Sequence, residues 1–183
     1  MHKLISESDE GLSFSKNLKL SCDLLRAINK LWKINKVHRD IKPKNIIWDT
    51  KHEDFVLIDA GISFALDETP LTQSGKTVGT LPYMSPEQIK GQKKSLDFRS
   101  DMYSLGITVF ESSTGFHPYL DRETTFRGIE DRIISDQVRL SDYKSDWPVA
   151  FTETVDQFLK KKAYLRPRSC EAVLETLSQI DYN

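Results

Sequence analysis

The sequence has little that would indicate a membrane, secreted or nucleic-acid-binding protein. No apolar run approaches the roughly 18 residues that a bilayer span needs, and the first residues do not lead into a signal peptide. The formal net charge of −1 gives no overall basic field that would attract nucleic acid. We therefore expect no membrane span, no nucleic-acid partner and a cytoplasmic location.

Cysteine is also scarce, and Cys22 and Cys170 lie far apart and outside any CxxC pattern. We interpret them as reduced, half-buried thiols rather than as a disulfide or a metal site. His2, His52 and His117 have no partner at metal-ligand spacing, so we predict that they are exposed or capping residues.

What is present is the composition of a soluble globular domain. Hydrophobic residues make up 38% and charged residues 29% of the 183 residues, a balance typical of a folded chain with a real core. The length suits one domain, and the sequence shows no internal repeat, low-complexity tract or linker. We therefore expect a single domain over residues 1–183.

Helical periodicity dominates the chain, with one short exception. Apolar residues at 46–48 and 55–58 flank a polar stretch and predict a small β-hairpin. The segment from Ser100 is apolar on nearly every side, which is typical of a buried central helix, and Gly115 is expected to end it. The lysines at 160–162 are predicted to be a solvated helix face. The other predicted helices cover residues 18–36, 122–136, 152–162 and 169–180, the last capped by Ser169. The predicted fold class is mainly α with a small β-hairpin.

A charged loop, VHRDIKPKNIIW at residues 37–48, leads into the predicted hairpin. Asp40 and Asn45 are five residues apart, and Asp59 closes the second strand, so a folded hairpin would bring their oxygen atoms together. Magnesium prefers oxygen ligands and keeps phosphate and water in its other positions. With Lys42 nearby, the loop has what phosphoryl transfer needs, which is charge neutralisation and a positioned nucleophile. Taken alone, the loop is also compatible with a charged surface turn.

Five segments, in order and in register, resemble motifs of the eukaryotic-type (Hanks-type) serine/threonine protein kinases. HRDIKPKN resembles the catalytic loop H-R-D-x-K-x-x-N, and Asp59-Ala60-Gly61 stands where the family has Asp-Phe-Gly. GTLPYMSPE at 79–87, RSDMYSLG at 99–106 and Arg166-Pro167 resemble the later motifs. The resemblance covers nearly all of residues 17–180 and implies the C-terminal lobe of the kinase fold, of the α+β class.

The resemblance implies a role for each residue of the reaction centre. Asp40 would orient and deprotonate the substrate hydroxyl, and Lys42 would stabilise the transferring phosphoryl group. Thr80 would hydrogen-bond near both of them. A lysine two residues after the aspartate resembles the serine/threonine branch rather than the tyrosine branch. Asn45 and Asp59 would hold Mg²⁺, with Mn²⁺ as a substitute, and with Lys42 they would bind ATP.

Other motif residues are implied to be regulatory or structural. Arg39 would pair with a phosphate on the activation loop that follows the hairpin, because an arginine binds phosphate oxygens in a fork. Glu87 and Arg166 would form a buried ion pair, Asp101 would brace the catalytic-loop backbone, and His38 would be structural. The candidate phosphorylation sites are Thr72, Ser74 and Thr77.

The sequence departs from the family pattern in two places. Ala60 replaces the phenylalanine, and we expect the loss of that ring to weaken the coupling to the other lobe. No two of the eight glycines form a Gly-x-Gly, and no V-A-I-K-like strand precedes the first helix. From the order of the matched motifs we therefore expect the N-terminal lobe to be absent.

Two functions follow from this pattern. One is a catalytic lobe that transfers the γ-phosphate of ATP to serine or threonine hydroxyls of a protein substrate, either as a fragment of a longer product or completed by a separate lobe. The alternative is a kinase-like binding or scaffold module without transfer, because half of the positioning apparatus is missing. We expect an exposed apolar surface around Ala60 and the first residues, and such a surface predicts, as partner, either a separate N-terminal lobe or a second copy of the chain.

Overall fold

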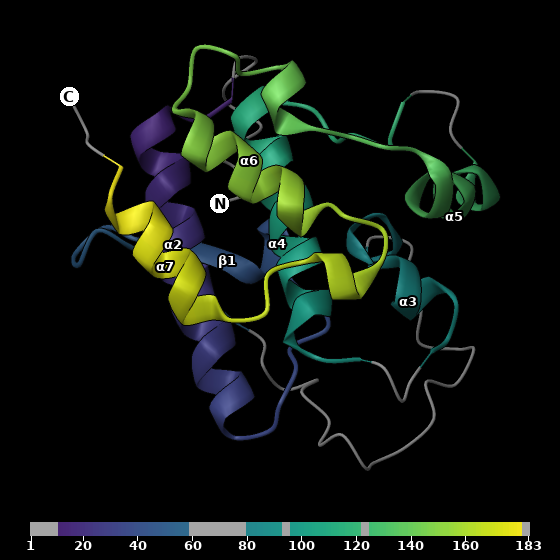
Figure 1. Ribbon diagram of the computed structural model, residues 1–183, viewed down its shortest axis with the longest axis horizontal. Helices are drawn as coiled ribbons and strands as arrows, with labels where there is room; N and C mark the ends of the chain where they lie inside the picture. The colour runs from purple at the N-terminus through teal and green to yellow at the C-terminus, as the bar shows by residue number, and fades with distance from the viewer. Residues whose placement is uncertain (1–10, 59–79, 93–95, 122–124, 181–183) are drawn as a thin grey trace.

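The computed structural model describes residues 11–58, 80–92, 96–121 and 125–180 (Figure 1). It is mainly helical with one two-stranded antiparallel sheet, which confirms the predicted fold class in outline. The α-helices are α2 (Phe14–Lys33), α3 (Pro86–Ile89), α4 (Phe98–Thr114), α5 (Phe126–Ser135), α6 (Val149–Phe158) and α7 (Cys170–Ser178). The strands are β1 (Ile46–Asp49) and β2 (Asp54–Leu57), and the 3-10 helices are η1 (Pro43–Asn45), η3 (Leu81–Tyr83), η5 (Leu140–Asp142) and η6 (Ala163–Leu165).

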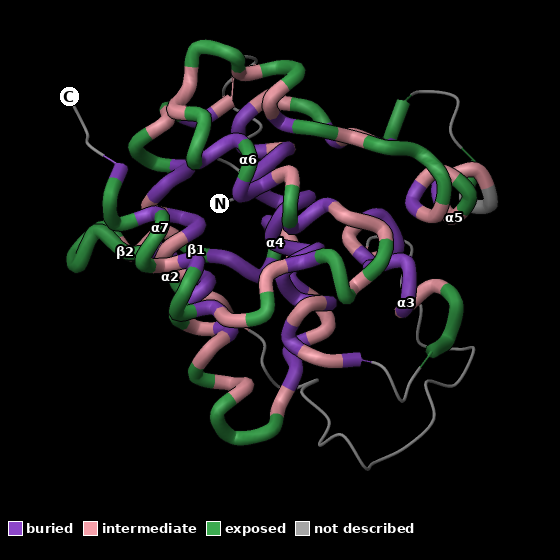
Figure 2. Tube along the Cα trace, in the orientation of Figure 1, coloured by how far each residue is buried: buried purple, intermediate pink, exposed green. Residues whose placement is uncertain are grey.

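The core is built around α4, which is buried along most of its length (Figure 2). Most of its buried residues are apolar or small, and a buried hydroxyl such as that of Thr108 donates to the carbonyl four residues earlier, at 2.9 Å. The helix begins at Phe98, two residues before the predicted start, and is capped by Asp97; the predicted end at Gly115 is confirmed. Gly115 has a φ of 81°, a left-handed conformation that glycine adopts without steric cost.

Helix α2 packs its apolar face against α4, β2 and α7. Leu18, Leu25 and Ile28 on that face are buried, as the helical spacing predicts. The helix begins earlier than predicted because the Ser13 hydroxyl accepts from a backbone N–H of the first turn. The buried Asn17 amide donates to the carbonyl of the residue before this cap at 2.9 Å and contacts a serine hydroxyl of α4. These bonds fix the start of α2 on the end of α4.

The hairpin follows the prediction, with β1 paired to β2 in the register Ile46↔Leu57 and Ile47↔Val56. Because side chains alternate along a strand, Ile46 and Phe55 face the core while Ile47 and Val56 face outward. The outward pair is 45% and 38% exposed. The hairpin therefore has one buried face and one apolar face that the described residues leave open.

The lysines at 160–162 do not form the solvated helix face that the sequence predicts. Helix α6 ends at Phe158, and the Lys161 ammonium turns inward. Its Nζ donates to the Tyr119 hydroxyl at 2.7 Å, the Ile133 carbonyl at 2.9 Å and the Tyr103 hydroxyl at 3.3 Å. Burial lowers the pKa of Lys161 to about 8. This lysine links the end of α5 to the core instead of facing water.

The remaining sequence predictions have mixed outcomes. Cys22 and Cys170 are free thiols, as expected, although Cys170 is fully buried. His117 is buried rather than exposed, and its Nδ1 accepts from the backbone N–H of Tyr119 at 3.1 Å within a turn. Burial lowers the pKa of His117 to about 4. His52 is exposed and contacts an aspartate. No helix in the described ranges has the length and apolar character of a membrane span.

Candidate active site

The charged loop predicted from the sequence runs from the end of α2 to the start of β1. Val37 and Ile41 are fully buried and anchor the loop on the core. Pro43 begins η1, where its fixed φ suits the first turn of a helix. Between the two anchors, Arg39 has a φ of 66°, a left-handed conformation that is uncommon outside glycine. Between the buried anchors, His38 is also buried, whereas Arg39 and Asp40 are partly exposed.

The loop gathers a compact polar cluster together with a residue from a distant segment. The Lys42 ammonium lies 2.8 Å from Asp40 Oδ1 and donates to the Thr80 hydroxyl at 2.7 Å. The Asn45 amide nitrogen donates to the backbone carbonyl and to Oδ2 of Asp40, both at 2.8 Å. The structure thus brings Asp40, Lys42, Asn45 and Thr80 together, as the resemblance implied.

This cluster has the chemistry of a site for an anion and a hydroxyl. The Asp40 carboxylate is an acceptor for a hydroxyl proton, and Lys42 supplies a positive charge beside it. Both bonds of the Asn45 side chain use its nitrogen, so its oxygen is not engaged by them and suits a hard cation such as Mg²⁺. No three His, Cys, Asp or Glu side chains gather as a metal cluster within the described ranges. A metal here would depend on Asn45, on Asp59 and on phosphate oxygens.

The backbone of the loop is held from beneath by α4. The Asp101 carboxylate accepts the backbone N–H groups of His38 and Arg39, each at 2.8 Å. Burial raises the pKa of Asp101 to about 7, although these two hydrogen bonds oppose the shift. The His38 ring contacts the Ile58 carbonyl at 3.2 Å, which ties the loop to the end of β2. Asp101 and His38 therefore occupy the supporting positions that the resemblance implied.

A buried ion pair fixes the segment that carries Thr80. Arg166 donates to both oxygens of Glu87, at 2.6 Å and 3.0 Å, and its side chain is 0% exposed. The Ser100 hydroxyl donates to Glu87 at 2.8 Å. Burial opposes ionisation of Glu87, but the hydrogen bonds and charge of Arg166 outweigh it, so the pKa of Glu87 is lowered. The structure therefore contains the pair that the resemblance implied.

Several predicted residues lie outside the described ranges: Asp59, Ala60, Thr72, Ser74 and Thr77. The described chain does lead toward the first of them, because the Ile58 N–H donates to the Asn45 carbonyl at 2.8 Å. Asp59 thus directly follows a residue that is bonded to the catalytic loop. Its role in metal binding, and those of the three hydroxyl residues as phosphorylation sites, stay predictions.

Sequence reasoning missed Gln88, whose side-chain nitrogen donates to the Arg39 carbonyl at 3.1 Å. Part of the signal was available, because Ser85 followed three residues later by glutamine is the pattern of a capping box. The contact with the loop was not predictable from local sequence.

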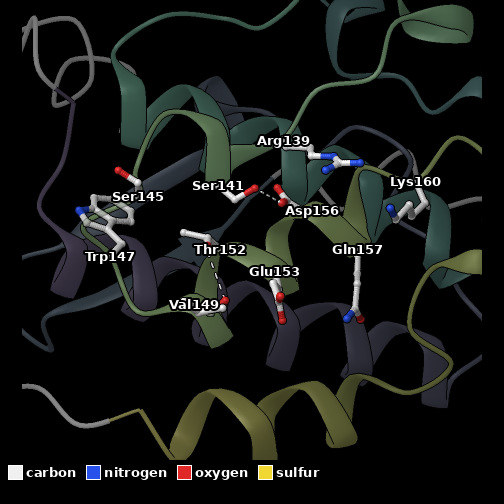
Figure 3. Close-up of a pocket in the computed structure, with 10 residues that line it drawn as sticks. All are labelled: Arg139, Ser141, Ser145, Trp147, Val149, Thr152, Glu153, Asp156, Gln157 and Lys160. Carbon is white, nitrogen blue, oxygen red and sulfur yellow. Dashed lines mark hydrogen bonds between the residues drawn. The ribbon is translucent and has the colours of Figure 1, made fainter.

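A separate hollow of about 660 Å³ lies between η5 and α6 (Figure 3). Its lining carries both signs of charge, with Arg139 and Lys160 against Glu153 and Asp156. The two oxygens of Asp156 accept from a backbone N–H and from a hydroxyl of η5, each at 2.6 Å. The lining of the hollow therefore has no dominant sign of charge. None of its lining residues belongs to the charged loop.

Comparison with known proteins agrees with the geometry. The protein kinase domain model matches residues 1–177. The whole chain is 33% identical to part of a probable serine/threonine-protein kinase of Clostridium acetobutylicum, covering 27% of that protein. Serine/threonine-protein kinase PknB of Mycolicibacterium smegmatis is 35% identical over 63% of this chain and 18% of its own length. The dual specificity mitogen-activated protein kinase kinase sek-1 of Caenorhabditis elegans is 33% identical over 82% of this chain and 44% of its own length.

The chain spans less than half the length of each of these relatives. The match with the domain model nevertheless covers almost all of it, including the loop of Asp40 and the ion pair of Glu87 with Arg166. The chain therefore belongs to the protein kinase family and, by resemblance, to its serine/threonine kinases.

Proposed function

We propose that residues 1–183 form the catalytic C-terminal lobe of a serine/threonine protein kinase, as a single domain with a cytoplasmic location. The lobe transfers the γ-phosphate of ATP to serine or threonine hydroxyls of a protein substrate. The observation that carries the proposal is the cluster in which Lys42 contacts both Asp40 and Thr80. A scaffold has no physical need for a carboxylate, an ammonium and a hydroxyl arranged in this way.

In this proposal Asp40 and Lys42 act on the two reacting groups. The substrate hydroxyl donates to the Asp40 carboxylate, which orients its oxygen toward the γ-phosphorus. As the new O–P bond forms and the bond to ADP breaks, the hydroxyl proton passes to Asp40. The Lys42 ammonium neutralises charge on the phosphoryl oxygens, and Thr80 holds that ammonium in place.

The metal is assigned to Asn45 and Asp59. Both Asn45 hydrogen bonds run through its nitrogen toward Asp40, which leaves the oxygen end of the amide as the ligand. The hydrogen bond between Ile58 and Asn45 supports the placement of Asp59 beside it. Mg²⁺, or Mn²⁺ in its place, supplies charge neutralisation of the phosphates when it is bound.

The partner that completes the site is proposed to cover the outward face of the hairpin. Ile47 and Val56 pair on that face and are among the exposed large apolar residues. Exposed apolar residues beside a reaction centre favour a covering surface. The proposed cover is a separate N-terminal lobe, with a second copy of the chain as the other outcome. Light scattering of the purified chain across a tenfold range of concentration separates a monomer from a self-associated form.

The proposed regulation acts through Arg39. In the described part of the chain its Nε is buried without a hydrogen-bond partner, and a buried donor of that kind is costly unless a partner arrives. A phosphate on Thr72, Ser74 or Thr77 would supply strong acceptors for the guanidinium. Replacing all three hydroxyl residues with alanine should remove the activation that prior incubation with Mg²⁺ and ATP produces.

The function is tested by transfer of labelled γ-phosphate from ATP with Mg²⁺ to a mixture of caseins. The purified chain is compared with its Asp40→Asn and Asp59→Asn variants. Ser169→Ala is a matched control, because Ser169 caps α7 away from the site. Acid hydrolysis of the product and separation of phosphoserine, phosphothreonine and phosphotyrosine identify the acceptor.

We expect phosphoserine or phosphothreonine from the chain and from Ser169→Ala, and none from the other two variants. A chain that is folded by circular dichroism but transfers no more phosphate than Asp40→Asn would refute transfer by the chain alone. Two functions would then remain, a catalytic lobe that needs its N-terminal lobe and the alternative, a kinase-like binding or scaffold module. Phosphotyrosine as the sole product would contradict the assigned branch.

A further inference from the structure

Gln88 in α3 is a side chain whose two ends contact different segments. Its Oε1 accepts from the backbone N–H of Ser85 at 2.9 Å and from the Ser85 hydroxyl at 3.0 Å. Its Nε2 donates to the Arg39 carbonyl at 3.1 Å. One end of the amide therefore completes the cap of a short helix, and the other end contacts the catalytic loop.

The amide has only one orientation that satisfies both contacts. Reversing it would place the NH₂ group against the Ser85 N–H and the amide oxygen against the Arg39 carbonyl. Both contacts would then be repulsive, donor against donor and acceptor against acceptor. A side chain with an acceptor at one end and a donor at the other is required, and glutamine has the length to present both.

The carbonyl that Gln88 binds belongs to the residue before Asp40. Arg39 has the left-handed φ of 66°, which for a non-glycine residue is held only where surrounding contacts determine it. Asp101 accepts its N–H at 2.8 Å, and Gln88 donates to its carbonyl. The backbone of Arg39 is thus bound at both polar groups, and this fixes the direction in which the chain enters Asp40.

Helix α3, which carries Gln88, is itself anchored in the core. Glu87, the neighbour of Gln88 in α3, is held by Arg166 and by the Ser100 hydroxyl. Helix α3 therefore has a buried anchor in the core, and neither Arg166 nor Ser100 belongs to the catalytic loop. Gln88 extends from this anchored helix to the loop, so the position of α3 helps to fix the position of the Arg39 carbonyl.

We propose that Gln88 is a positioning residue for the proposed kinase reaction, because it holds the Arg39 carbonyl and thereby orients the Asp40 carboxylate. It touches neither substrate nor nucleotide, so its removal lowers the turnover rate without changing the affinity for ATP. The kinetic part of this inference rests on the proposed function, whereas the structural part does not.

Two variants separate positioning from helix capping. Gln88→Glu keeps an oxygen for Ser85 but places a second oxygen against the Arg39 carbonyl, whereas Gln88→Met removes both contacts. Positioning predicts that both variants disturb the loop. A role limited to the cap predicts that Gln88→Glu behaves as the unmodified chain does. Ser169→Ala, which removes the cap of α7, controls for a general loss of stability.

The first readout is amide hydrogen exchange of the full chain without nucleotide. The N–H groups of His38 and Arg39 are reporters, because both donate to Asp101. Loss of one neutral hydrogen bond corresponds to a change of about fivefold in a rate or an equilibrium constant. We expect these two amides to exchange about fivefold faster in both Gln88 variants. In Ser169→Ala their exchange rates should be unchanged.

The second readout is the steady-state kinetics of phosphate transfer. We expect kcat to fall about fivefold in both Gln88 variants, with the KM for ATP within about twofold of the unmodified chain. Unchanged exchange in both variants, an effect in Gln88→Met alone, or faster exchange with an unchanged kcat would each overturn the proposal. An unmodified chain without transfer would refute transfer by the chain alone, and the exchange data would then decide whether Gln88 positions the loop.

Discussion

Neutralising Glu87 is the perturbation whose cost follows most directly from the structure. In Glu87→Gln the Arg166 guanidinium loses its counter-charge while its side chain stays 0% exposed. Removing one partner of a buried ion pair typically costs about 3–5 kcal/mol. Arg166 also donates to the carbonyls of Lys160 and Arg99, at 2.8 Å each, and these bonds remain. We therefore expect the lower end of that range, about 3 kcal/mol.

A loss of this size is a large fraction of the roughly 5–15 kcal/mol that separates folded from unfolded domains. It corresponds to a fall in Tm of about 9 °C for a domain of this size. The assay is urea unfolding followed by far-UV circular dichroism, with the free energy of unfolding taken from the midpoint and slope. Asp54→Asn is the control, because Asp54 pairs with Lys19 at 2.6 Å but is 51% exposed, and such pairs contribute less than about 1 kcal/mol.

The double variant Glu87→Leu/Arg166→Met tests the electrostatic part of the reasoning. With both charges replaced by apolar side chains, no buried charge is left unpaired, and most of the lost stability should return. A cost below about 1 kcal/mol for Glu87→Gln, or a double variant that is less stable than Glu87→Gln, would refute this account of the anchor.

The remaining predictions concern two other buried positions. Because burial lowers the pKa of Lys161 to about 8 from the ordinary 10.5, the unfolded chain binds more protons than the folded chain between these pH values. The free energy of unfolding should therefore gain a favourable contribution from this group as the pH rises from 8 to 10, and urea unfolding of Lys161→Met should lack that contribution. Gly106→Ala should cost about 1–3 kcal/mol in the same assay, because an added Cβ would lie 2.9 Å from the Phe158 Cβ in a packed core.

Each of these predictions has a defined contrary result. An identical pH dependence in the unmodified chain and in Lys161→Met would show that the ammonium is not buried as described. A Gly106→Ala variant as stable as the unmodified chain would show that α4 and α6 separate without cost at this contact.

Local signals accounted for most of the secondary structure. The hairpin, the end of α4 at Gly115 and the cap of α7 at Ser169 each follow from turn, cap or periodicity patterns within a few residues. The inward turn of Lys161 could not be predicted in this way. Its partners Tyr119 and Ile133 lie 42 and 28 residues away in sequence, so only the folded chain distinguishes it from its two lysine neighbours.

In the candidate site, too, the local sequence indicates the residues but not their contacts with distant segments. Asp40, Lys42 and Asn45 are close in sequence and were assigned by resemblance, but the contact of Lys42 with Thr80 spans 38 residues. The bond from Gln88 to the Arg39 carbonyl spans 49 residues and joins a side chain to a backbone group. Motifs name the residues of such a site, whereas tertiary packing decides which of them touch.

A single-turnover rate of phosphate transfer from ATP with Mg²⁺, measured for the unmodified chain and for Asp40→Asn, decides whether Asp40 acts as the base. Asparagine keeps the size of Asp40 and the contact with Asn45 but cannot take the hydroxyl proton. A positioned base contributes about 10²–10⁴-fold to such a rate. We expect a loss in that range with unchanged folding, and transfer by Asp40→Asn at the rate of the unmodified chain would contradict the proposed role of Asp40.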